Sequence, residues 1–222
     1  MSVAALLLLS DGRLPAGGHA HSGGAEAAVK SGRVHDTPSM AAFLTGRLHT
    51  TGLTTAALAA AAAGGRFATD ALDEAADART PSPALRATSR RLGRQLLRAA
   101  LAAWPDPGLD RLRAAHPGGA HQPVVLGATA RAAGLTPAQA AAVAAYESVN
   151  GPATACVRLL GLDPYEVTAV LARLGPALDA VAAEAAAAAG GPDLDHLPAA
   201  SAPLLDLYAE QHSSWKVRLF AS

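Results

Sequence analysis

The residues of this chain whose types and spacing could do chemistry are concentrated in the stretch LPAGGHAHSGGAE, residues 14–26. Two histidines, His19 and His21, are one residue apart, and Glu26 closes this glycine-rich segment. Imidazole and carboxylate groups bind transition metals, so one interpretation is a metal site on both histidines with Glu26 or His35 as a further ligand. No third ligand stands at a defined spacing, however. We therefore expect no permanently bound metal or cofactor, and keep His19 and His21 as candidate ligands.

The glycines of the same stretch could instead cradle a phosphate group. A phosphate-binding loop needs the pattern GxxxxGK[ST], and a dinucleotide-binding turn follows a β-strand. Neither pattern occurs in the chain. Cys156 lies in a helical pattern between alanine and valine, which predicts a buried and unreactive thiol. Glu147, near a predicted helix end, is interpreted as a surface or capping charge, so we predict no catalytic residue and no enzymatic activity.

Two further groups of residues favour contacts with a partner protein. The first is a stripe of arginines at intervals of four on one predicted helix, which is either a solvated face or a docking surface. The second is the C-terminal segment from about residue 209 to 222, which carries large apolar and basic residues of the types enriched in interfaces. The candidate partner-binding residues are Arg86, Arg90, Arg94, Arg98, His212, Trp215, Lys216, Arg218, Leu219 and Phe220.

The composition of the chain predicts the kind of fold that positions these residues. Half of the 222 residues are hydrophobic but only 4% are aromatic, so alanine and leucine must form the core. Both residues have high helix propensities, and 222 residues suit one domain. We expect a single all-α domain, a bundle of roughly ten helices, with a flexible N-terminal segment at about 1–13 and an interaction tail at about 209–222.

Charge and cysteine content narrow the class of protein. Eighteen basic residues balance eighteen acidic ones, so the chain shows no electrostatic footprint for nucleic acid or an anionic membrane. The single cysteine fits a reducing compartment, and the apolar run at 3–9 is too short to span a bilayer. We expect a cytoplasmic protein.

Capping residues directly before proline mark several helix starts, at Thr37, Ser82, Thr136 and Asp163. The segment 104–123 is predicted as a loop-rich interruption. The predicted helices lie near 3–9, 24–31, 38–49, 53–63, 67–78, 83–103, 122–133, 137–149, 152–161, 164–188 and 203–210.

Several segments together resemble one known family, UreF, the urease accessory proteins of the nickel-insertion machinery. LLLLSDGRLPAGGHAHSGGAEAAVKSGRV resembles the opening of the family, and TSRRLGRQLLRAA resembles its central helix. HQPVVLGATARAAGLTPAQAAAVAAYESVNGPATACVRLLGL and the ending HSSWKVRLFAS are similar to its later segments. His19 and His21 stand where the family usually has Phe and Tyr. The matching positions of the opening are Leu14, Pro15, Gly17, Ser22, Gly24 and Glu26.

The resemblance implies an all-α, dimeric protein without enzymatic activity of its own. UreF-like proteins bridge the accessory protein UreD, also called UreH, to the GTPase UreG. That assembly delivers nickel to the urease apoprotein and couples delivery to GTP hydrolysis. Nickel would then be in transit and not a bound cofactor, and the N-terminal loop would be a structural turn leading into a helix.

Two alternatives from other classes stay open at this point. One is a small metal-binding helical enzyme built on His19 and His21, which tight, stoichiometric metal binding would support. The other is a helical ligand-binding regulator, which should contain a large apolar cavity.

Overall fold

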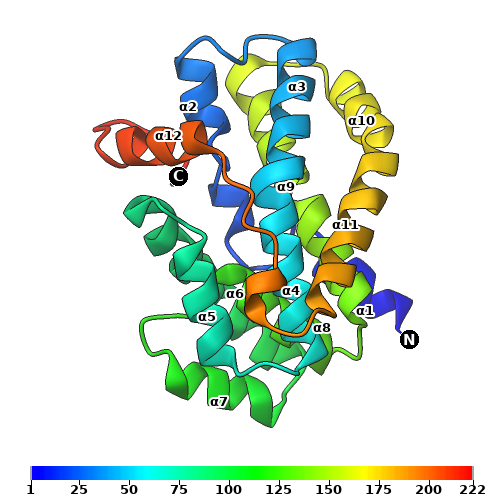
Figure 1. The fold of residues 1–222 in the computed structure, drawn as a ribbon. Coiled ribbons are helices and arrows are strands. Elements are labelled where there is room, and N and C mark those ends of the chain that lie inside the picture. The colour runs from blue at the N-terminus through cyan, green and yellow to red at the C-terminus, as the bar shows by residue number, and fades with distance from the viewer. Residues whose placement is uncertain (1, 222) are drawn as a thin grey trace.

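The computed structural model describes residues 2–221, and over this range the chain folds into α-helices with short 3-10 and π segments and no β-strand. The predicted all-α fold is confirmed. Figure 1 shows α3 and α4 running through the middle of the molecule, with α9 beside them, α10 and α11 on one side, and α2 and α12 on the other. The α-helices are α1 (Val3–Leu9), α2 (Ala25–Lys30), α3 (Thr37–Arg47), α4 (Leu53–Gly64), α5 (Thr69–Ala78), α6 (Pro83–Ala103), α7 (Pro107–Ala115), α8 (Gln122–Ala132), α9 (Pro137–Leu160), α10 (Pro164–Arg173), α11 (Gly175–Ala189) and α12 (Pro203–Ser213).

Side chains cap the helices mostly as the sequence predicts. Ser82, Thr136 and Asp163 each accept a hydrogen bond from a backbone N–H in the first turn of α6, α9 and α10. The start of α3 is an exception, because Asp36 and not Thr37 is its cap, accepting from the N–H of Ser39. Thr37 is already the first helical residue, so its proline follows one position later than predicted.

The predicted break between 38–49 and 53–63 is wrong, because α3 and α4 form one continuous helix. A π-helical segment, Leu48–Gly52, joins them. A π segment widens one turn and leaves room for a neighbour to approach. Gly52 uses that room, since a Cβ there would lie 2.8 Å from Oγ of Ser148 in α9. The glycine therefore marks a helix crossing and not a helix end.

The predicted break between 137–149 and 152–161 is also wrong, because α9 continues through Pro152. A proline inside a helix has no N–H, so the carbonyl four residues earlier loses its partner. That carbonyl belongs to Ser148, and Nε of Arg47 donates to it at 2.7 Å. An arginine from α3 thus replaces the missing hydrogen bond, which a local sequence pattern does not reveal.

Two other boundaries differ from the prediction for local reasons. The region 164–188 splits at Leu174 into α10 and α11. Pro176 lies in the first turn of α11, where its missing N–H costs no helical hydrogen bond, whereas inside one continuous helix it would leave a carbonyl unpaired. The predicted loop at 104–123 contains α7, whose cap Asp106 accepts from the N–H of Gly108. Leu109 and Leu112 of α7 are buried, so this helix forms part of the core.

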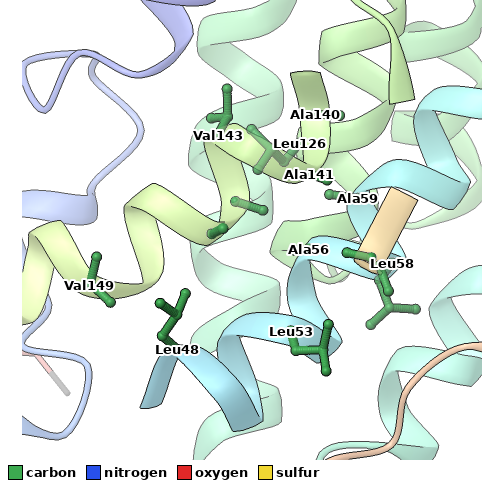
Figure 2. Packing of buried hydrophobic residues seen from close by; sticks show 14 of the residues in the cluster. Leu48, Leu53, Ala56, Leu58, Ala59, Leu126, Ala140, Ala141, Val143 and Val149 are labelled. Atoms are coloured by element: carbon green, nitrogen blue, oxygen red, sulfur yellow. The ribbon is translucent and has the colours of Figure 1, made fainter. Parts of the chain in front are cut away.

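The core is built around α4, in which every residue from Ala56 to Ala63 is buried. Helices α8, α9 and α11 pack against it, and Figure 2 shows alanine, valine and leucine side chains of α4, α8 and α9 at this contact. The closest approach is at Gly127 of α8, where a Cβ would lie 2.1 Å from the carbonyl oxygen of Ala59. Small side chains here replace the bulk that aromatic residues provide in most cores.

This close approach gives a stability prediction. The substitution Gly127→Ala should lower the free energy of unfolding by about 1–3 kcal/mol, because overpacking outweighs the better helix propensity of alanine. The matched control is Gly46→Ala in α3, where a Cβ meets nothing within 4 Å and alanine should be neutral or stabilising. Thermal and urea unfolding measure both; equal effects of the two substitutions would contradict this account of the α4–α8 contact.

Candidate functional site

The N-terminal loop places one buried carboxylate at the start of α2. Gly17, Gly23 and Gly24 adopt left-handed backbone angles, with φ of 81°, 58° and 91°, which L-residues with side chains rarely adopt. These turns carry the chain through the short 3-10 segment Gly18–Ala20 and into α2. Glu26, in the first turn of α2, is only 8% exposed. The expected structural turn is present, and it determines where Glu26 lies.

The Glu26 carboxylate holds the C-terminal tail. Its Oε2 lies 2.8 Å from Nε2 of His212 in α12 and accepts the N–H of Phe220 at 3.1 Å, while Oε1 accepts the N–H of Leu219 at 2.8 Å. Burial by itself would raise the pKa of Glu26, but the hydrogen bonds from His212 and the two backbone amides lower it below its ordinary value. Glu26 is therefore ionised at neutral pH and closes what we call the tail clasp: Glu26, His212, Leu219 and Phe220.

Ring contacts support the tail clasp on both sides. The Trp215 ring lies 4.9 Å from that of His212, and Nζ of Lys30 lies 3.7 Å from the Trp215 centroid. The Phe220 side chain is buried beneath the guanidinium of Arg158, with 4.6 Å between its Cζ and the ring centroid. The tail is thus anchored to its own chain at Trp215 and at Phe220.

The same tail turns other side chains outward. Lys216, Val217, Arg218 and Leu219 are exposed, with Val217 at 83% and Leu219 at 71%. Helix α12 adds two exposed leucines, Leu204 and Leu207. Figure 1 shows α12 and the C-terminal end together at one side of the molecule, beside α2. We call the exposed residues Leu204, Leu207, Lys216, Val217, Arg218 and Leu219 the tail surface.

The two histidines of the loop occupy different environments. His19 is exposed, whereas His21 is buried, and burial, helped by nearby Arg91, lowers the pKa of His21 to about 4. His21 is therefore uncharged at neutral pH. Within residues 2–221 no three His, Cys, Asp or Glu side chains are grouped so that they could hold a metal ion. The described residues supply no third ligand to His19 and His21, so a metal contact of either histidine stays a prediction.

Three arginines of the predicted stripe are bonded within the chain. Arg86 donates to the carbonyls of Thr80 and Pro81, and Arg94 donates to the carbonyl of Gly118. Arg90 donates to the carboxylates of Asp73 and Asp77 at 2.7 and 2.8 Å.

Only the fourth arginine of the stripe, Arg98, is exposed and makes no polar contact with the described residues. The hydrogen bonds of Arg86, Arg90 and Arg94 mainly hold α5 and the loop before α8 against α6. Arg98, at the C-terminal end of the stripe, remains as the candidate for docking a partner. Asp73, Asp77 and His121, whose Nε2 lies 2.7 Å from Asp77, complete this network. The sequence pattern alone does not mark Asp73, Asp77 and His121.

Glu147 differs from its interpretation as a surface or capping charge. It lies in the interior of α9, and its Oε2 accepts from Nε2 of Gln122 at 3.0 Å. Glu147 is half-buried, and burial raises its pKa to about 7, while the Gln122 hydrogen bond acts in the opposite direction. Cys156, by contrast, is fully buried as predicted, and burial raises the pKa of its thiol to about 11.

The fold and these contacts define a helical protein whose polar side chains hold its own segments together and whose C-terminal tail presents a surface. In the part of the chain that the structure describes, no helix is long and apolar enough to cross a membrane. A model of the UreF family matches residues 34–175. The chain belongs to the UreF family of urease accessory proteins.

Relatives are similar in sequence to this chain over nearly its whole length. A urease accessory protein UreF from Mycolicibacterium vanbaalenii is 47% identical over all of this chain and 99% of its own length. UreF from Mycobacterium sp. is 45% identical over 98% of this chain and 97% of its own, and UreF from Mycobacterium tuberculosis is 43% identical over 100% and 99%. These relatives are named as accessory proteins, so the expectation of a non-enzyme is confirmed.

The tail clasp predicts the effect of removing one charge. Glu26→Gln should lower the free energy of unfolding by about 1–3 kcal/mol, because the amide cannot accept all three hydrogen bonds and places its NH2 group against a donor. Trypsin should then cut faster after Lys216 and Arg218, as followed by mass spectrometry. Glu184→Gln, an exposed position on α11, is the matched control. Unchanged cleavage in Glu26→Gln would contradict the clasp.

The raised pKa of Glu147 predicts a pH dependence of stability. The folded protein holds the proton of Glu147 more tightly than the unfolded chain, in which the pKa has its ordinary value of 4.5. The fold therefore loses stability as the pH rises from about 4.5 through 7. Glu147→Gln should therefore raise stability at pH 8 by about 1–3 kcal/mol and have little effect at pH 5. Urea unfolding at both pH values measures this. The exposed Glu74→Gln serves as control, and a pH-independent effect at Glu147 would contradict the assignment.

Proposed function

We propose that this protein is the adaptor of a urease maturation complex. In this role it bridges UreD, also called UreH, to the GTPase UreG in the cytoplasm and acts as a homodimer. It supports GTP-dependent delivery of nickel to the urease apoprotein, with nickel in transit and not held as a cofactor. Membership of the UreF family and the names of the relatives support a role in urease maturation. The specific partners follow from the resemblance of the sequence.

The observation that carries the adaptor role is the tail surface. The clasp fixes the backbone of Leu219 and Phe220 on Glu26 while the Leu219 side chain faces outward. An interface element that is already ordered loses less conformational entropy when a partner binds. Apolar residues alternate there with Lys216 and Arg218, so a partner with an apolar groove and an acidic rim would be complementary. We assign this surface to UreD.

A co-purification experiment tests the assignment. Val217→Asp and Leu219→Asp place a charge on the tail surface but leave the backbone N–H of Leu219 free to bind Glu26. When all urease accessory proteins are co-expressed, each variant should weaken retention of UreD by at least about tenfold, as expected for a charge buried in an interface. Urease activity of the co-expressed enzyme should fall in parallel.

The matched control is Tyr165→Asp, which changes an 86% exposed residue of α10 outside the tail surface. This variant should retain UreD as the unchanged chain does. Equal retention of UreD by the tail variants would overturn the assignment to this surface, and failure of the unchanged chain to retain either UreD or UreG at low salt would overturn the adaptor role itself.

A further inference from the structure

A cavity of about 210 Å³ lies between the N-terminal loop, the π segment with α4, α6 and α12. Much of its wall is apolar, with Leu58, Leu92 and Leu205 among the lining residues. Two arginines, Arg47 and Arg79, also line it. None of the six tail-surface residues lines the cavity, although His212 of the tail clasp does, and the proposed adaptor role makes no use of the cavity.

The guanidinium of Arg47 has an unused edge. Its Nε donates to the carbonyl of Ser148, and no acceptor within residues 2–221 takes a hydrogen bond from Nη1 or Nη2. No carboxylate of the described residues lies within ion-pair distance of it. Burial lowers the pKa of Arg47 to about 10, which still leaves it charged at neutral pH. Gly23 packs against the guanidinium, since a Cβ there would lie 3.3 Å from Nη2.

The other charged groups of the cavity do not neutralise Arg47. Arg79 donates to the backbone carbonyls of Ala75, Leu194, Leu197 and Pro198, so its charge faces dipoles and no described carboxylate.

Asp206 also lines the cavity, but it accepts the N–H of Ser82, and burial raises its pKa. Two guanidinium groups and one carboxyl group thus line the cavity, and the half-buried Arg47 has no ion-pair partner among the described residues, an arrangement that is costly.

We propose that this cavity binds a small organic carboxylate. The two carboxylate oxygens would accept from Nη1 and Nη2 of Arg47, which is the end-on bidentate geometry that guanidinium favours. The apolar body of the ligand would lie against the leucines. An apolar cavity of about 150 Å³ can hold a benzene ring, so the volume suits a ligand of the size of benzoate or butyrate. A phosphate ion would leave most of its oxygens facing apolar walls, which favours a carboxylate with an apolar body.

The first experiment titrates the full-length protein with benzoate, benzamide and inorganic phosphate, followed by calorimetry and ligand-observed NMR. Benzoate should bind and raise the thermal unfolding midpoint in a concentration-dependent way. Benzamide has the same shape without the charge and should bind at least about tenfold more weakly. Equal binding of benzamide, binding of phosphate in preference to benzoate, or no binding of benzoate would each overturn the proposal.

The second experiment locates the ligand with variants. Arg47→Gln removes the charge but keeps an N–H donor for Ser148, and it should weaken benzoate binding at least about tenfold. Arg173→Gln, the same change at an exposed position of α10, should bind benzoate as the unchanged protein does.

Leu92→Trp places a much larger side chain on the cavity wall and leaves Arg47 itself unchanged, so it keeps the test decisive if Arg47→Gln does not fold. It should also weaken benzoate binding. Unchanged benzoate affinity in Leu92→Trp, or in a folded Arg47→Gln, would overturn the proposal. Neither outcome bears on retention of UreD, so this result and that of the adaptor test are distinguishable.

Discussion

The close packing of neighbouring backbones around α4 is the constraint on which the rest of the structure depends. With few aromatic residues, the core gains buried area by bringing helices together, and Gly127 stands where a Cβ would meet the backbone of α4. Backbones at such distances leave no space for large side chains or for water. Most polar groups in the interior therefore find a partner within the protein, because an unpaired one is costly, and Nη1 and Nη2 of Arg47 are an exception.

This constraint explains how the polar side chains are used. Arg47 supplies the donor that Pro152 lacks, Arg86 and Arg94 bind loop carbonyls, and Glu26 accepts two backbone amides of the tail. These contacts satisfy backbone groups that helices leave unpaired at a proline, at a loop or at a chain end. In this protein a regular pattern of charged residues therefore indicates hydrogen bonds within the chain and does not by itself indicate a binding site.

The sequence is sufficient for the fold class, most helix starts and the burial of Cys156, because these depend on propensity, capping and local hydrophobic pattern. It is not sufficient for α9, since the tolerance of Pro152 depends on Arg47, about one hundred residues away. The arginine stripe shows the same limit. A period of four places Arg86, Arg90 and Arg94 on one helix face, but the opposing Asp73, Asp77 and loop carbonyls belong to other segments.

The N-terminal loop and the C-terminal tail, separate features of the sequence, form one unit in the structure. The glycines of the loop aim Glu26 inward, and Glu26 in turn fixes which tail side chains face inward. Phe220 is buried and Leu219 is exposed because adjacent amides bind the two oxygens of one carboxylate. Any change in the loop that moves Glu26 must therefore alter the surface that the tail presents.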